Sequence, residues 1–211
     1  MTYYSIVRYC IIALLFILIY VLFKKNKALA RFLHYRRRTA IIAVIAIYFL
    51  ISTALSVIPF ENAFVTFSSL ESAYSYYNTE PLSYVVEGQC SDLVISQKDA
   101  TSTLNIVKKE STGWKIGKNL DLRTVKVITI DGGKIWLMQY KNTDDFYISI
   151  DVIVADNNGA PSITDNNSTE FLELSHIPND TNKQFYEYYG YIHNYGEWYE
   201  ISVNGLAIEL D

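Results

Sequence analysis

An uncharged apolar segment of nineteen residues, Ala40–Ile58, constrains this chain more than any other feature. As an α-helix it would be about 28 Å long, close to the ~30 Å hydrocarbon core of a bilayer. Pro59 follows directly and would end such a helix. A second apolar segment, Tyr9–Phe23, reaches this length only if its helix begins six residues earlier, with Arg8 extending its side chain to the membrane surface. The sequence therefore predicts two membrane spans, at about residues 3–23 and 40–58.

A signal peptide is the alternative interpretation of the first apolar segment. Its apolar region is long for a signal peptide and has no small-x-small cleavage site. It also runs into Lys24 and Lys25 rather than into a mature domain. These features favour a retained span.

The linker between the two apolar segments, residues 24–38, has seven Lys or Arg among fifteen residues. Short loops this basic stay on the cytoplasmic side of a membrane. We therefore expect a multi-pass protein of the cell membrane, with a helical hairpin at 1–58, a cytoplasmic loop at 24–38 and an extracytoplasmic domain at 59–211. Leu29, Phe32 and Leu33 would share one face of a helix in this loop. A lipid-sensing or partner-docking role is therefore an alternative to a role in topology alone.

Charge is distributed unevenly between these parts. Residues 1–38 carry eight Lys or Arg and no acid, whereas the rest carries ten Lys or Arg against 22 Asp or Glu, a formal charge of 10 − 22 = −12. An acidic domain repels phosphate backbones, so nucleic acid is not an expected partner. The expected partners are the lipid bilayer and other membrane or envelope proteins. The two cysteines, Cys10 and Cys90, fall in different parts, so a disulfide within the domain is not expected.

The region after the membrane segments reads as one short helix followed by strands. Ser68 and Glu71 have the spacing of a capping box at the start of a helix within residues 67–78. About eleven short strands follow Pro81, with hairpin signals at Asp131–Gly133 and Asn204–Gly205. Residues 155–169, rich in Asn, Asp and Ser, are predicted to form a long exposed loop. The predicted fold class is two transmembrane α-helices followed by a mainly-β (α+β) antiparallel domain with one short packing helix.

Motifs of catalysis are absent from the sequence. It has no GxSxG, HExxH, CxxC or phosphate-binding glycine loop. A zinc site made by His176, His193 and a carboxylate is one alternative, and Cys90 as a catalytic nucleophile is another. The spacing of these residues in the sequence is not specific for either. Asp144 and Asp145 lie in a predicted turn and are expected to be solvated. We assign no catalytic, metal or cofactor residue, expect no cofactor, and do not expect an enzyme.

Eight aromatic side chains lie between Phe185 and Tyr199. In a strand they would occupy both faces, which favours core packing across a sheet. The alternative is an exposed sugar platform. The candidate ligand surface consists of Glu187, Tyr189, Tyr191 and Trp198.

Several segments, YVVEGQCSDLVIS, TLNIVKK with TGWKIG, and GYIHNYGEWYEISVNGLAIEL, resemble the envelope-facing domains of uncharacterised Firmicutes membrane proteins. The resemblance covers about residues 64–117 and 185–210. It implies a Gram-positive cell-envelope location and a β-rich domain, and it carries no activity. The sequence thus predicts a binding or interaction module, including an accessory role beside a transporter or a sensor. A small immunity or self-protection protein is the alternative, and an envelope enzyme is the third hypothesis.

Overall fold

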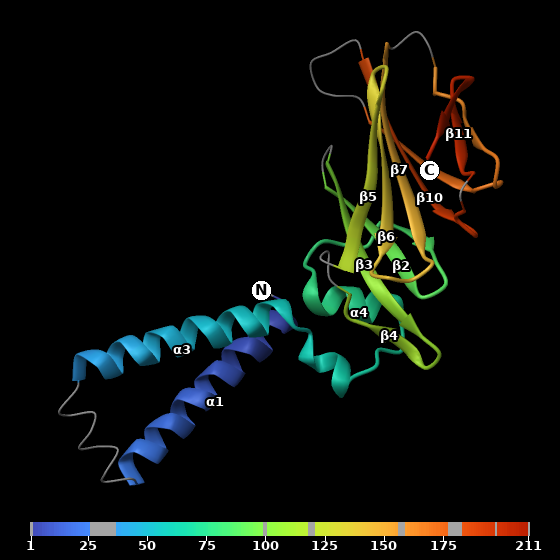
Figure 1. Ribbon diagram of the computed structural model, residues 1–211. Coiled ribbons are helices and arrows are strands. Elements are labelled where there is room, and N and C mark those ends of the chain that lie inside the picture. Colours follow the sequence, from blue (N-terminus) through green and yellow to red (C-terminus); the bar gives the residue numbers. More distant parts are fainter. Residues whose placement is uncertain are drawn as a thin grey trace. The chain divides into compact units, whose positions relative to one another are not determined.

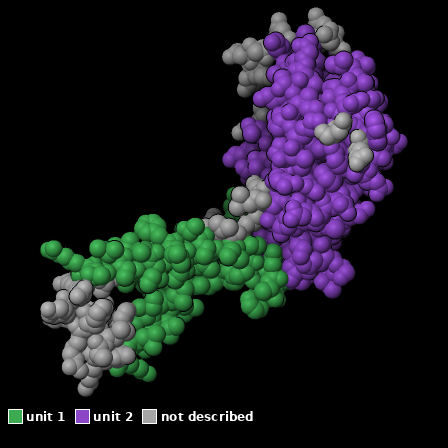
Figure 2. Space-filling model, viewed as in Figure 1, with its two compact units in different colours: residues 1–65, 75–79 green, residues 66–74, 80–211 purple. Residues whose placement is uncertain are grey.

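The computed structural model describes residues 2–25, 37–98, 101–117, 121–155, 159–176, 183–196 and 198–210. The protein has an α+β fold with mostly antiparallel β-sheets and few helices. It divides into two compact units, one of residues 1–65 with 75–79 and one of residues 66–74 with 80–211 (Figure 2).

The first unit contains two long helices, α1 (Tyr3–Lys25) and α3 (Arg37–Val57) (Figure 1). By length and composition, Tyr3–Leu22 is long and apolar enough to cross a membrane. The apolar stretch of α3 within the described residues, Ile42–Leu55, is shorter. Among the described residues one helix therefore meets this criterion, rather than the two that were predicted. Most of the predicted basic loop, residues 26–36, lies outside the described residues.

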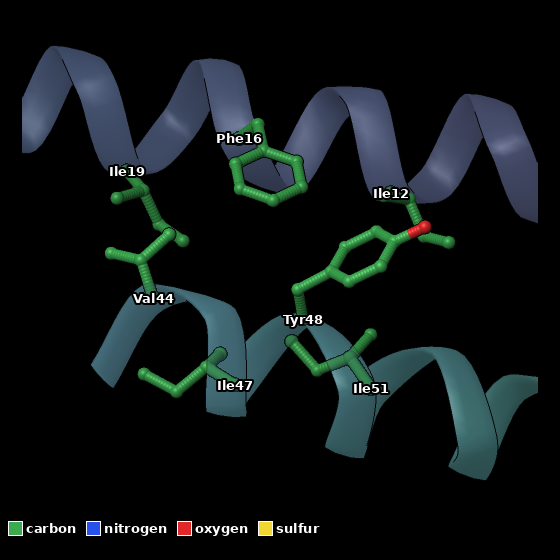
Figure 3. A pocket seen from close by; sticks show the side chains of 7 residues that line it. All are labelled: Ile12, Phe16, Ile19, Val44, Ile47, Tyr48 and Ile51. Carbon is green, nitrogen blue, oxygen red and sulfur yellow. The ribbon is translucent and has the colours of Figure 1, made fainter. Parts of the chain in front are cut away.

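An apolar seam joins α1 and α3 (Figure 3). Phe16 of α1 and Tyr48 of α3 face each other with their ring centroids 6.0 Å apart. They border a hollow of about 170 Å³ that contains no charged side chain among its lining residues, which are Ile12, Phe16, Ile19, Val44, Ile47, Tyr48 and Ile51. Apart from the Tyr48 hydroxyl, the side chains that line this hollow are hydrocarbon.

The Arg8 side chain does not extend outward, which corrects the expectation from sequence. It is 7% exposed and its Nε donates to the backbone oxygen of Leu55, 2.6 Å away. Its guanidinium also binds Glu61, a residue of the short 3-10 helix η1 (Phe60–Ala63). The carbonyl groups at the end of α3 lack partners within the helix, and Arg8 supplies donors to them.

The predicted short helix is present as α4 (Leu70–Tyr77), within the expected residues 67–78. Its first turn is capped by Ser69, whose Oγ accepts a hydrogen bond from the Ser72 backbone N–H at 3.2 Å. Ser69 therefore takes the role that the sequence suggested for Ser68.

The described residues of the second unit form three antiparallel sheets. The first, sheet A, has the order β1-β2-β3-β4. Its strands are β1 (Tyr84–Glu87), β2 (Ser91–Lys98), β3 (Thr101–Glu110) and β4 (Gly113–Lys115). Among the described strands β1 pairs with β2 alone, so it is an edge strand of this sheet.

Sheet B, with the order β5-β6-β7-β10-β9, is the largest. Its strands are β5 (Leu122–Ile130), β6 (Gly133–Tyr140), β7 (Phe146–Ala155), β9 (Phe171–His176) and β10 (Lys183–Ile192). In this sheet β9 is an edge strand, and β10 is paired on both sides, with β7 and with β9.

Sheet C has the order β12-β11-β8 and lies beside β10 (Figure 1). It contains β8 (Ile163–Asp165), β11 (Glu200–Val203) and β12 (Leu206–Glu209). The predicted tight turn between the last two strands is confirmed, with positive φ at both Asn204 and Gly205 as a type I′ turn requires. The predicted long loop is wrong in part, because β8 forms there by pairing with β11.

Sheet B is covered on both faces, which explains the aromatic residues of β10. Tyr186 and Tyr188 belong to a core shared with Ile201 and Val203 of sheet C. Tyr189 and Tyr191 belong to a second core shared with residues of sheet A. Alternate residues of a strand point to opposite faces, so both faces of β10 are apolar because both are buried. The interpretation of these rings as core is confirmed.

Candidate functional site

The turn between β1 and β2 is held by a buried carboxylate. Asp145, which is 1% exposed, accepts hydrogen bonds from the backbone N–H groups of Gln89 (3.1 Å) and Cys90 (2.8 Å). It also accepts from the Ser91 hydroxyl at 2.8 Å and the Tyr191 hydroxyl at 3.1 Å. Asp145 is therefore a structural anchor, and the expectation that it is solvated is wrong. Its neighbour Asp144 is exposed.

Tyr147 and Gly88 complete this arrangement. The Tyr147 hydroxyl donates to the backbone oxygen of Ser91 at 2.9 Å, and burial raises the pKa of Tyr147 above its ordinary value. A Cβ atom on Gly88 would lie 2.3 Å from the same hydroxyl. Only glycine therefore fits here. The turn that follows β1 is built with little freedom to move.

Beside this turn is a groove of about 690 Å³. The end of β1, the start of β9 and the end of β10 surround it. Its lining residues are Val85, Val86, Glu87, Gly88, Gln89, Ser168, Glu170, Phe171, Leu172, Tyr191 and His193.

The groove is bordered by strand edges rather than by a sheet face. Residues 85–87 of one border and residues 170–172 of the other are consecutive in the chain. Consecutive side chains of a strand point to opposite faces of its sheet, so three of them in a row do not line one groove from the same face. What three consecutive residues do share is the backbone edge of their strand. Both β1 and β9 are edge strands of their sheets. The groove therefore presents backbone hydrogen-bonding groups that no strand in the described part of the chain occupies.

The direction of these groups on β1 follows from one hydrogen bond. The N–H of Gly88 donates to Ser91 oxygen at 3.0 Å, so these two residues form a hydrogen-bonded pair of the antiparallel ladder. Hydrogen-bonded and non-hydrogen-bonded pairs alternate along an antiparallel ladder, so Val86, two residues before Gly88, also points its N–H and C=O groups toward β2. We therefore expect the N–H and C=O groups of Val85 and Glu87 to point away from β2.

The charge of the groove is negative. Glu87 and Glu170 are both exposed carboxylates, and the described lining residues include no Lys or Arg. Lys109 lies beside the turn, where its ammonium donates to the Gly88 backbone oxygen at 3.3 Å and forms an ion pair with Asp92. His193 is exposed at the end of β10, where its ring meets the Tyr191 ring edge-on with centroids 4.7 Å apart. Burial, and then the Asp145 charge, raise the pKa of Tyr191 to about 12, so this hydroxyl stays protonated at neutral pH.

The structure does not bring the predicted ligand surface together as one exposed platform. Glu187 and Tyr189 are 7% and 2% exposed, and Tyr191 is 6% exposed. Tyr191 borders the groove, whereas Trp198, 82% exposed, lines a separate hollow. The burial of β10 between two other sheets, which one strand's pattern does not reveal, is the physical reason.

Glu187 pairs across the sheet with a second carboxyl group. It lies opposite Asp151 of β7 and accepts a hydrogen bond from the Ser102 hydroxyl. Burial raises the pKa of Asp151 to about 7, and the negative charge of Glu187 adds to the increase. Asp151 therefore holds a proton at mildly acidic pH.

The alternatives involving metal or nucleophilic chemistry gain no geometric support. Within the described part of the chain, no three His, Cys, Asp or Glu side chains are placed to hold a metal ion. Cys90 is exposed in the turn beside the groove. Its backbone N–H donates to Asp145, and its backbone oxygen accepts from the Lys109 N–H at 2.9 Å.

Of the residues that line the groove, the sequence analysis singled out Tyr191 and His193 and missed the others. Glu87, Gln89 and Glu170 appear in the sequence as ordinary polar residues at strand ends. An available signal was the turn sequence EGQCSD, where a glycine is followed by short polar residues. Comparisons with protein-family models, with curated proteins and with solved structures find no match for this chain.

Proposed function

We propose that this protein is a membrane-anchored binding module whose β domain holds an extended, cationic peptide segment in the groove between β1 and β9. The observation that carries the proposal is the pair of edge strands at one groove. An extended peptide binds such an edge by adding a strand, with main-chain hydrogen bonds for affinity and side-chain contacts for selectivity.

The charge of the groove selects the occupant. Glu87 and Glu170 lie on its two borders, and no Lys or Arg among the lining residues neutralises them. A segment with Lys or Arg side chains complements this charge, and the acidic balance of the chain after residue 38 steers it toward the site.

The turn at residues 88–91 supports binding by being ordered in advance. Asp145 fixes the backbone of this turn by hydrogen bonds, and the Tyr147 hydroxyl packs closely against Gly88. A border that is already ordered loses little conformational entropy when a peptide binds.

The anchor that we propose is a two-span hairpin with the β domain outside the cell. The apolar length of α1 supports the first span. Arg8 near the start of α1 binds both Leu55 near the end of α3 and Glu61 just beyond it, which supports an antiparallel return of the chain. The basic linker supports a cytoplasmic turn. The resemblance to Firmicutes membrane proteins supports a Gram-positive envelope, where an accessory role beside a transporter or a sensor suits this function.

A peptide-binding measurement on the full chain in lipid nanodiscs tests the groove. We expect heptapeptides selected from a random library to be enriched in Lys and Arg. Replacing peptide amides one at a time by esters should weaken binding at alternate positions, because a strand faces its partner with every second residue. Weakening without this alternation, or no selected peptide at all, contradicts the proposal.

Side-chain variants test the charge of the groove. Glu87→Gln and Glu170→Gln should each weaken binding of the selected peptides about tenfold or less and reduce its dependence on salt. The matched control is Glu209→Gln, an exposed acid on β12 away from the groove, which should bind like the wild type. Equal effects of all three variants would mean that only net charge matters.

Cysteine labelling tests the topology. In a Cys10→Ser variant, the exposed Cys90 is the remaining thiol. A membrane-impermeant maleimide should label it in intact cells. Labelling only after lysis would place the β domain inside the cell.

A further inference from the structure

A second hollow, of about 220 Å³, lies on the segments that flank β11. We call it the Trp198 shelf. It is lined by Asn166, Asn167, Asn194, Gly196, Trp198 and Tyr199. These residues include three amides, two aromatic rings and no charged side chain.

Hydrogen bonds hold the backbone beneath the shelf. The Asn166 amide donates to the backbone oxygen of Trp198 and accepts from the Glu200 N–H at 3.1 Å. Tyr199 is 3% exposed, and its hydroxyl donates to Asp165 at 2.7 Å. Hydrogen bonds thus hold the backbone of Trp198 and of the residues that follow it, although the indole is not buried.

Two side chains of the shelf are available to a ligand. Trp198 is 82% exposed, a large apolar area to leave in water. Asn194 is exposed, and its side chain has no hydrogen-bond partner within the described part of the chain. An exposed aromatic face beside an amide with both donor and acceptor groups matches the two surfaces of a pyranose, its apolar C–H face and its hydroxyl edge.

We infer that the Trp198 shelf binds a neutral saccharide, with one pyranose ring stacked on the indole of Trp198 and its hydroxyl groups bonded by Asn194. Among the described lining residues of the shelf none is charged, so none of them would attract an ionic ligand. The hollow is large enough for one ring, so further rings of a chain would extend into solvent.

The shelf adjoins the peptide groove. Asn167, a lining residue of the shelf, donates from its amide to the backbone oxygen of His193, a lining residue of the groove. A ligand with a sugar next to a peptide would therefore engage both sites, and its affinity would exceed that of either part alone. This last step rests on the proposed function; saccharide binding at the shelf does not.

The test uses the full chain in lipid nanodiscs, which avoids sugar-based detergents, with ¹⁵N-labelled tryptophan. The protein has three tryptophans, and the signal of Trp198 is assigned by its loss in Trp198→Phe. The probes are a β-1,4-linked N-acetylglucosamine trisaccharide and cellotriose. At least one should shift the Trp198 indole signal and leave the signals of Trp114 and Trp136 in place.

Variants then locate the binding. Trp198→Ala and Asn194→Gly should weaken saccharide binding about tenfold or more, equivalent to ~1.4 kcal/mol. Glycine suits position 194 because φ there is 54°. The matched control is Leu206→Ala, an exposed apolar truncation at 60% exposure on β12, which should bind normally.

The outcomes separate the two ideas. No shift of Trp198 with either probe, or unchanged binding by Trp198→Ala, overturns the saccharide site. Unchanged binding of the selected cationic peptides to Trp198→Ala would show in the same sample that the groove is intact. If the wild type binds no cationic peptide but its Trp198 signal still shifts with a saccharide, the proposed peptide groove is contradicted and the saccharide site is supported.

Discussion

Arg8 and Glu61, 53 positions apart in the chain, form a buried bidentate ion pair within the first unit. The second contact, from Nη2 of Arg8 to Oε2 of Glu61, measures 3.1 Å, and both side chains are less than a tenth exposed. Tyr4 stacks on the guanidinium with its ring centroid 3.1 Å from Cζ, and Tyr76 donates to Glu61 at 3.2 Å. This arrangement ties the beginning of α1 to the residues that follow α3.

Breaking this pair should destabilise the first unit strongly. Glu61→Gln and Arg8→Gln should each cost about 3–5 kcal/mol, because each leaves one buried charge without its partner. The double variant should cost less than the sum of the two. Thermal unfolding of the full chain in nanodiscs measures this, with the exposed Glu71→Gln as the control. Additive losses would show that the pair does not couple the two segments.

Removing Asp145 should destabilise the β domain. Asp145→Ala removes the acceptor of two part-buried N–H groups, those of Gln89 and Cys90, and of the buried Ser91 and Tyr191 hydroxyls, at a cost of more than about 3 kcal/mol. Asp144→Ala, a change at the exposed neighbour, should cost no more than about 0.5 kcal/mol. Denaturant unfolding followed by tryptophan fluorescence compares the two. Similar midpoints would contradict the anchoring role.

Gly88→Ala should weaken peptide binding as well as stability. The added methyl group would lie 2.3 Å from the Tyr147 hydroxyl and 2.7 Å from the Ser91 oxygen, so the turn must shift. Gly196→Ala is the matched control, because the nearest atom to its Cβ is 3.9 Å away. Peptide affinity and melting temperature should both fall for the first variant and stay near wild type for the second. A wild-type affinity in Gly88→Ala would show that the turn does not shape the groove.

Stability should fall as pH rises through the range set by Asp151. Its pKa is about 7 in the folded protein and about 3.9 in an unfolded chain, so the folded state binds more protons between these values. The contribution of the protonated Asp151 to the stability of the folded state is complete below about pH 4, and it is lost as pH rises to 7 and above. Lys134 and Glu187 are its cross-strand neighbours. Asp151→Asn should therefore melt higher than the wild type at pH 8 and lose that advantage at pH 4. A difference independent of pH contradicts this assignment.

Truncating two aromatic residues of the C-terminal region to alanine should change the stability of the protein by very different amounts. Tyr188 is 3% exposed and donates to Pro161 oxygen at 3.0 Å, so Tyr188→Ala should cost about 3–5 kcal/mol. Trp198→Ala should change stability by about 0.5 kcal/mol or less, because the indole is exposed. Urea unfolding of the full chain measures both. A large loss for Trp198→Ala would mean that its ring is packed in solution.

Local pattern was enough to predict much of this protein. The apolar length of Tyr3–Leu22, the strand at Lys183–Ile192 and the tight turn at Asn204–Gly205 depend on composition, alternation and backbone preference within a few residues. Such preferences act between neighbours in the chain, so the sequence displays them directly.

Only the tertiary structure decided which polar residues were buried and which aromatic residue stayed exposed. Asp145 became an anchor because the turn after β1, over fifty positions earlier, meets it. Glu187 was enclosed because β10 lies between two other sheets, whereas Trp198 stayed outside them. The groove arose because the edges of two different sheets border the same space. Burial and edge position depend on contacts between distant segments, and a strand's own residues do not encode which partner will cover them.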